Sequence, residues 1–269
     1  MIKLLKIEWL KMKNYTAFVA IGLIFLVCVF GVSFIAYTIN KSVQDTPAAM
    51  LTSSFFSFPN VWHTIAYLSN FTLFLPGLLI ILMVTNEFTY KTHRQNIIDG
   101  WSRNEFIKVK IAIVFIFSAA ASLWVCIVAF VIGLISGGSV LFDKIEYIGY
   151  FFIQSASILM LALMISVLVK RAALSIAIFI AYVYILENLL GVIINGLESR
   201  NAAEPLKITP FGDLLPINAT DNLVPFPFFR EILNKAIPHL NIYILLGASL
   251  LYLAGYIFIA RKQFLSRDL

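Results

Sequence analysis

Six long apolar stretches alternate with shorter polar segments along the chain. They cover residues 16–39, 64–85, 111–135, 148–169, 172–194 and 241–260. About 20 consecutive apolar residues form a helix that can cross a hydrocarbon core about 30 Å thick. The pattern therefore predicts an all-α polytopic membrane protein with six transmembrane helices. We expect the 269 residues to form a single transmembrane domain.

Residues 1–14 differ from these stretches because apolar and basic positions alternate there at helical spacing. Four apolar residues fall on one stripe and three lysines fall off it, namely Ile2, Leu5, Trp9 and Met12, and Lys3, Lys6 and Lys13. This pattern predicts an amphipathic helix that lies along the membrane surface. A plain basic stretch ahead of the first span would give the same residues, so both interpretations stay open.

Two of the polar segments between predicted spans, residues 40–63 and 195–240, contain few lysines and arginines for their length. The second contains six prolines but keeps apolar runs such as residues 211–217. A segment this apolar is unsuited to a free loop. We therefore expect one or two short interfacial or re-entrant helices on the outer side, between the fifth and sixth spans.

The most charged interior segment is residues 86–110, which read NEFTYKTHRQNIIDGWSRNEFIKVK. It lies between two predicted spans, so it must lie at a membrane surface. Asp99 and Gly100 interrupt its helical pattern. Ser102 is followed three residues later by Glu105, which predicts a capping box that starts the next helix in water.

Nine positions of this segment carry a family resemblance, and they are Glu87, Thr92, Arg94, Ile97, Gly100, Ser102, Arg103, Phe106 and Lys110. Their spacing resembles the pattern E-x(4)-T-x-R-x-x-L-x-x-x-x-S-R-x-x-F-x-x-x-K of the export-type (type-2) ABC transporter permeases. Gly100 and Trp101 replace a frequent proline and hydrophobic pair of that family, and His93 replaces a small residue. Outside residues 86–110, the chain matches in span count and spacing.

The resemblance implies that residues 86–110 hold a coupling helix that docks into a separate ABC ATP-binding subunit. The coupling residues would be Glu87, Thr92, Arg94, Gly100, Trp101, Ser102, Arg103 and Lys110. ATP and Mg²⁺ would be bound by that partner subunit, so this chain needs no cofactor of its own. A second permease chain, identical or different, would complete the pathway. A basic loop that only orients the spans is the alternative.

Composition and charge support a membrane location. The chain is 61% hydrophobic and 13% charged, too apolar for a soluble domain. Fourteen lysines and arginines fall in the segments on one side of the predicted spans and six on the other. The positive-inside rule then places both termini and residues 86–110 in the cytoplasm. We expect a multi-pass protein of the cell (inner or plasma) membrane that contacts lipid and no nucleic acid.

Three polar residues inside predicted spans are candidates for a transport pathway, namely Asn70, Glu187 and Asn188. Asn70 either lines the pathway or makes an interhelical hydrogen bond. A carboxylate that faces lipid costs about 2–3 kcal/mol, so Glu187 should face the bundle interior, be protonated or reach the outer interface. It is either a polar point near an outer gate or part of a structural pair with Asn188 or Tyr184.

Sequence motifs of enzymes are absent. There is no G-x-x-x-x-G-K-[ST] and no G-x-S-x-G, so we expect no enzyme and assign ATP hydrolysis to the partner. The three histidines lie in separate segments and both cysteines lie in spans, which argues against a metal site. The prediction is therefore an exporter permease. The alternative is an ATP-independent protein, either a secondary carrier or a passive resistance or scaffold protein, although we find no internal repeat typical of carriers.

Overall fold

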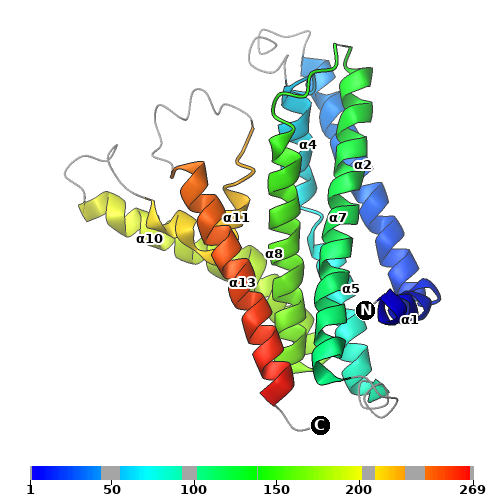
Figure 1. Cartoon of the computed structure of the whole chain (residues 1–269). Helices are drawn as coiled ribbons and strands as arrows, with labels where there is room; N and C mark the ends of the chain where they lie inside the picture. Colours follow the sequence, from blue (N-terminus) through cyan, green and yellow to red (C-terminus); the bar gives the residue numbers. More distant parts are fainter. Residues whose placement is uncertain are drawn as a thin grey trace.

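A computed structural model describes residues 2–43, 55–92, 102–137, 139–201, 210–227 and 240–266. These residues form helices joined by turns, and no strand occurs among them. The long helices are α2 (Thr16–Val43), α7 (Arg103–Ile135), α8 (Glu146–Val169) and α13 (Ile242–Ser266). Helix α1 (Ile2–Lys13) lies beside the start of α2. Helix α1 and the end of α13 lie toward the same end of the bundle, which we call the terminal end (Figure 1).

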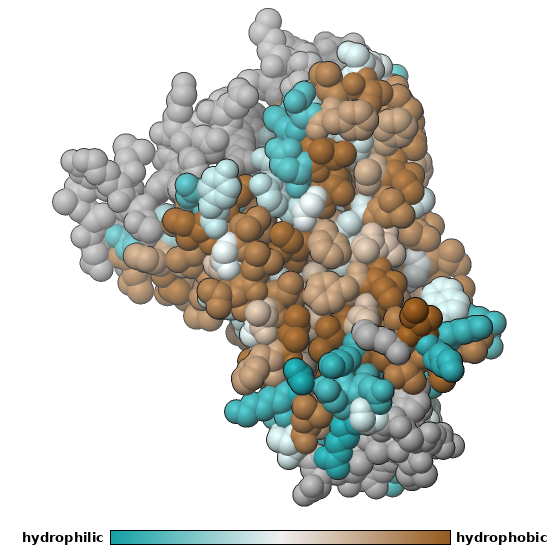
Figure 2. All heavy atoms as spheres, viewed as in Figure 1, coloured by the Kyte–Doolittle hydropathy of each residue, from teal (hydrophilic) through white to brown (hydrophobic). Residues whose placement is uncertain are grey.

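Five helical stretches are long and apolar enough to cross a membrane, and they are α2, α7, α8, residues 172–198 and α13. A bent pair, α4 (Asn60–Asn70) and α5 (Phe74–Thr89), makes a sixth if it is counted as one span. The predicted all-α class is therefore confirmed, and the candidate spans number five, or the predicted six when the bent pair counts as one. Polar side chains gather at the terminal end, and apolar side chains cover much of the surface above it (Figure 2).

The second predicted span is broken in the middle. Helices α4 and α5 meet at an angle of 46° across residues 71–73. Pro76 lies in the first turn of α5, where its missing N–H costs no hydrogen bond. The hydroxyls of Ser69 and Thr72 donate to backbone carbonyls on the α4 side of the break. The polar residues and the proline that interrupt this apolar stretch thus coincide with a change of direction.

The fifth predicted span is irregular as well. It consists of α9 (Ala172–Ile180), the π-helix η1 (Ala181–Leu186) and α10 (Glu187–Asn201). Asn188 Nδ2 donates to the carbonyls of Val183 and Tyr184 within the π-helix, each at 3.3 Å. Helix α10 extends away from the bundle (Figure 1). The sequence predicted a plain helix over residues 172–194, because apolar composition does not distinguish a π-helix from an α-helix.

The start of α7 is formed by the predicted capping box. Ser102 Oγ accepts a hydrogen bond from the Glu105 backbone N–H at 3.2 Å, and Glu105 Oε2 accepts one from the Ser102 N–H at 3.0 Å. Two backbone donors at the helix end are satisfied in this way. Helix α7 therefore begins well before the apolar stretch and includes Lys110 in its second turn.

Two short helices follow α10, namely the 3₁₀ helix η3 (Phe211–Leu214) and α11 (Pro216–Asp221). They fit the expectation of one or two short helices between the fifth and sixth spans. Tyr252 Oη of α13 donates to the Leu214 carbonyl at 3.0 Å, and α11 also packs against α8. Helix α8 is the most deeply buried span, so this segment contacts the centre of the bundle.

Candidate functional site

Four charged side chains meet near the terminal end of the bundle, and we call them the ion cluster. They are Glu8, Lys11, Glu87 and Lys110. Lys110 Nζ lies 2.6 Å from Glu8 Oε2 and 2.7 Å from Glu87 Oε1. Lys11 Nζ lies 2.9 Å from Glu8 Oε1 and 3.6 Å from Glu87 Oε1. Each carboxylate therefore contacts both ammonium groups.

The ion cluster is largely buried but has no net charge. The side chains of Glu8 and Lys110 are 1% and 3% exposed. Burial of an unpaired charge would be costly, but two acids and two lysines balance each other. Burial alone would raise the pKa of Glu8, yet the ammonium groups of Lys110 and Lys11 hold that pKa below its usual value. Glu8 therefore keeps its negative charge at neutral pH and loses it only in acid.

The ion cluster joins three helices that are far apart in sequence. Glu8 lies on α1, Glu87 lies near the end of α5 and Lys110 lies about 10 Å from the start of α7. A second bond, from Asn86 Nδ2 to Tyr15 Oη at 2.9 Å, fastens the α1–α2 junction to α5. The ends of α5 and α7 that flank residues 93–101 are thus held against α1.

Aromatic packing adds the last helix to this region. The rings of Phe106 on α7 and Phe264 on α13 stack with centroids 4.8 Å apart. Phe88 on α5 lies 6.4 Å from Phe264, and Lys110 Nζ lies 5.1 Å from the Phe106 ring centre. The ion cluster is therefore covered on one side by an aromatic group that links α5, α7 and α13.

The residues predicted to couple to an ATP-binding subunit have different surroundings. Glu87 and Lys110 are buried in the ion cluster, so a part in coupling would come from positioning helices. Ser102 caps α7. Thr92 and Arg103 are half-buried, and they lie close to the two ends of residues 93–101. The other three, Arg94, Gly100 and Trp101, lie outside the described residues. Contact of this segment with a partner stays a prediction.

Sequence reasoning missed Glu8 and Lys11. Glu8 is the lone acid in residues 1–14, and it shares the buried face of α1 with Met12 one turn later. Ile2 and Trp9, which belong to the predicted apolar stripe, are 84% and 53% exposed. The sequence signal for the ion cluster was a single acid in a basic segment, one helical turn from an apolar residue of the predicted stripe.

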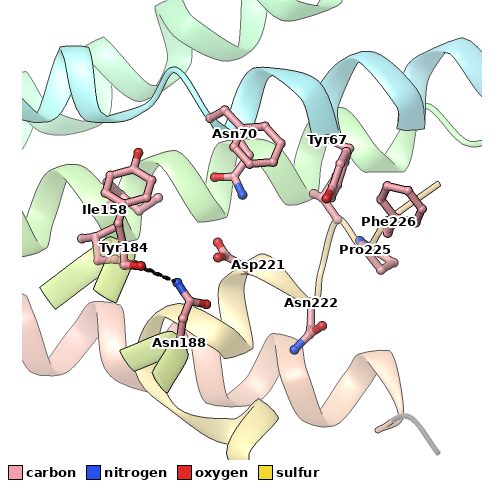
Figure 3. Close-up of a pocket in the computed structure, with 12 residues that line it drawn as sticks. Tyr67, Asn70, Ile158, Tyr184, Asn188, Asp221, Asn222, Pro225 and Phe226 are labelled. Carbon is pink, nitrogen blue, oxygen red and sulfur yellow. Dashed lines mark hydrogen bonds between the residues drawn. The ribbon is translucent and has the colours of Figure 1, made fainter. Parts of the chain in front are cut away.

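A second polar site lies at the break in the second span. A cavity of about 340 Å³ lies between α4, η1, α10 and the end of α11. Its polar lining includes Asn70, Asn188 and Asp221 (Figure 3). The two asparagines were both predicted as pathway candidates, and the fold brings them to one cavity. Asp221 was not singled out, because it lies outside the apolar stretches.

Glu187 is buried but is not part of the cavity lining. Its Oε1 accepts hydrogen bonds from the backbone N–H groups of Ile217 and Asn218, the latter at 2.9 Å. These two donors lie in the first turn of α11 and would otherwise lack partners. The carboxylate thus faces the interior and holds the start of α11 in place by these hydrogen bonds. It does not pair with Asn188 or Tyr184.

We expect Glu187→Ala to destabilise the protein by about 1–3 kcal/mol, because it leaves two buried backbone donors without an acceptor. Glu187→Gln retains an oxygen and should lose less. Thermal unfolding of the purified variants in detergent measures the difference. Glu146→Ala, which removes an exposed acid at the start of α8, is the matched control. Equal unfolding temperatures for the Ala and Gln variants would contradict the claim that Glu187 stabilises α11 as a hydrogen-bond acceptor.

The described part of the chain was predicted to hold no metal site. No group of three or more His, Cys, Asp and Glu side chains there could hold a metal ion. Cys28 and Cys126 are free.

Compared with the models of known protein families, the sequence of the chain matches one of them. Residues 4–188 match the model of a family described as ABC-2 family transporter protein. The match covers more than half of the chain, from α1 to the start of α10, and includes every residue of the ion cluster. A search of curated proteins finds no match.

Proposed function

Because the chain belongs to the ABC-2 family of transporter membrane proteins, we propose that it is the permease subunit of an ATP-driven exporter. Membrane proteins of this family work with ATP-binding subunits. In the proposed transporter, this multi-pass chain forms the substrate pathway. A separate subunit binds ATP and Mg²⁺ and hydrolyses ATP.

The ion cluster is the observation that carries this proposal. A subunit that pushes on residues 86–110 moves the spans only if this segment is held firmly to the helices that it joins. Otherwise the segment would shift alone and the spans would stay in place. Buried ion pairs resist separation, because each separated charge would be left without a partner in a poorly solvated site. Helices α1, α5 and α7 therefore move as one unit when the segment between α5 and α7 is displaced.

Two features transmit this displacement through the bundle. Helix α7 has 33 residues and is about 50 Å long, so a tilt at one end moves the other end. The bend between α4 and α5 provides a hinge at residues 71–73, beside the polar cavity. Movement at the terminal end would thus change the shape of the cavity. The cavity would then open to one side of the membrane and afterwards to the other.

The proposed orientation places both termini and residues 86–110 in the cytoplasm, in the cell (inner or plasma) membrane. The supporting observation is the concentration of lysines and arginines in those segments. A second permease chain completes the pathway in this proposal. Exposed apolar side chains on α2 and α10, such as Val27 and Val192, would face lipid or that second chain.

One observation favours a secondary carrier instead. The second span is broken at residues 71–73 and the fifth contains a π-helix at Ala181–Leu186. These are corresponding positions in the first and last three spans, and carriers often have discontinuous helices at matching positions. A carrier would be driven by an ion gradient and would need no ATP-binding subunit.

Purification of the tagged chain from its native membranes distinguishes the two proposals. We expect mass spectrometry of the detergent-solubilised complex to identify a P-loop ATPase, and ATP hydrolysis by the complex to exceed that of the isolated ATPase. A matched preparation with a tagged, unrelated multi-pass protein controls for non-specific capture. Recovery without an ATPase, together with transport driven by an ion gradient, would contradict the ABC proposal and support a carrier.

A further inference from the structure

The cavity beside the bend lies where three irregular elements meet. These are the α4–α5 break, the π-helix η1 and the end of α11 (Figure 3). Its volume of about 340 Å³ is within the range of sites that hold small ligands. Polar and apolar side chains both line it, so it could hold a group with one polar end.

Asp221 gives this cavity a negative charge. Among the described residues that line it, none is a lysine, arginine or histidine. Gln154 Nε2 donates to Asp221 Oδ1 at 2.8 Å, and the Asn70 amide and the Asp221 carboxylate point toward one another (Figure 3). Neutral amides solvate a carboxylate but do not cancel its charge. The cavity therefore favours a cation.

The local fold does not account for this charge. Asp221 is the last residue of α11, the end at which the helix dipole disfavours an acid. The charged group on another described element that acts on Asp221 is Glu187, which is also an acid. A neutral residue of the same shape would therefore suit the fold better than an aspartate.

Aromatic side chains form another part of the wall. The Tyr67 ring meets Phe71 and Phe226 edge to face, with centroids 5.7 Å and 5.4 Å apart. Aromatic rings attract cations through their faces and also pack against apolar groups. Asn222 and Asn70 add amide oxygens that can accept N–H hydrogen bonds. A ligand with an ammonium group and an apolar body would match this lining.

We infer that this cavity binds a primary ammonium group carried on an apolar body, with Asp221 as its counter-ion. The assignment of that group to a transported substrate rests on the proposed function. The binding itself does not, because it requires neither ATP nor a partner subunit.

The test uses ligand-observed ¹⁹F NMR with the full chain in lipid nanodiscs. The probes are 4-fluorophenethylamine and its neutral analogue 2-(4-fluorophenyl)ethanol, and empty nanodiscs correct for partition into lipid. We expect saturable binding of the amine and none of the alcohol. Asp221→Asn should weaken amine binding about tenfold or more, since it keeps the acceptor for Gln154 but removes the charge. Asp143→Asn, which removes an exposed acid elsewhere, should bind as the unmodified protein does.

The unmodified protein supplies a second measurement that does not depend on a variant folding. Burial raises the pKa of Asp221 to about 6, with Glu187 adding to the effect. The carboxylate therefore becomes neutral as the pH falls from 7.5 to 5, whereas a primary amine stays charged. Amine affinity should fall over this range, and Asp221→Asn should abolish that pH dependence. Other titratable groups around the cavity are Glu187 and the phenols of Tyr67 and Tyr184. His63 of α4 is a further one, since its Nε2 lies 2.7 Å from the carbonyl oxygen of the lining residue Pro225. The Asp221→Asn variant separates the effect of these groups from that of Asp221.

The outcomes are distinct from those of the purification experiment. Equal binding of the amine and the alcohol, unchanged amine affinity in Asp221→Asn, or an affinity independent of pH would each overturn the cation site. Recovery without an ATPase, together with transport driven by an ion gradient, would overturn the proposed function and would leave the cation site standing.

Discussion

Lys110→Met is expected to destabilise the protein by about 3–5 kcal/mol, the usual cost of removing one partner from a buried ion pair. Lys110 bonds to both Glu8 and Glu87, so its removal leaves two largely buried carboxylates with only the half-exposed Lys11. Chemical or thermal unfolding in detergent measures the loss. Lys108→Met removes an exposed lysine from the same helix and should change stability by no more than about 0.5 kcal/mol.

A compensated variant tests whether unpaired charge is the cause. Glu8→Gln and Glu87→Gln, added to Lys110→Met, remove both carboxylates along with the ammonium. Lys11, which remains, is half-exposed and can be solvated, and replacing all the charges of a buried ion pair or triad costs far less stability than removing one partner. The triple variant should therefore be more stable than Lys110→Met alone. If the single variant is as stable as Lys108→Met, the cluster does not hold these helices together.

Arg103→Glu is expected to weaken association with the ATP-binding subunit about tenfold or more, the effect of reversing a charge at a docking surface. Arg103 is the first residue of α7, and an acid there is favoured by the helix dipole. The dipole therefore favours the substituted residue, and thermal unfolding of the variant in detergent separates docking from stability. The measurements are the amount of ATPase recovered with the tagged chain and its rate of ATP hydrolysis.

Arg171→Glu is the matched control for this change. Arg171 is exposed and lies directly before α9, so the substitution also places an acid at a helix start. It lies outside residues 86–110, and its complex should hydrolyse ATP as the unmodified complex does. Equal losses in both variants would mean that net charge matters rather than this segment.

The features that the sequence predicted are those determined by nearby residues. Apolar length sets the spans, and the bond between Ser102 and Glu105 depends on residues three apart. The π-helix was missed because residues 172–194 are apolar throughout, so composition does not reveal its register. The ion pair between Glu8 and Lys110 joins residues 102 positions apart, and only the packed fold reveals it.

The candidate sites follow the same rule. Asn70 and Asn188 were predicted one by one, since a polar side chain inside an apolar stretch is visible in the sequence. Their shared cavity depends on the bend of one span and on the place of α11. Asp221 lies in a proline-rich segment, where an acid is unremarkable until that segment folds against Gln154 of α8. Glu187 was visible, but its partners in α11 were not.

The central claim is that residues 86–110 receive the push of an ATP-binding subunit. Photo-crosslinking in native membranes tests it directly, with a benzophenone side chain at Arg103 or, as control, at the exposed Ser139 beyond the opposite end of α7. The account predicts a crosslink to a P-loop ATPase from Arg103 and none from Ser139. A crosslink from Ser139 alone would place the ATPase at the other end of the bundle and contradict the account.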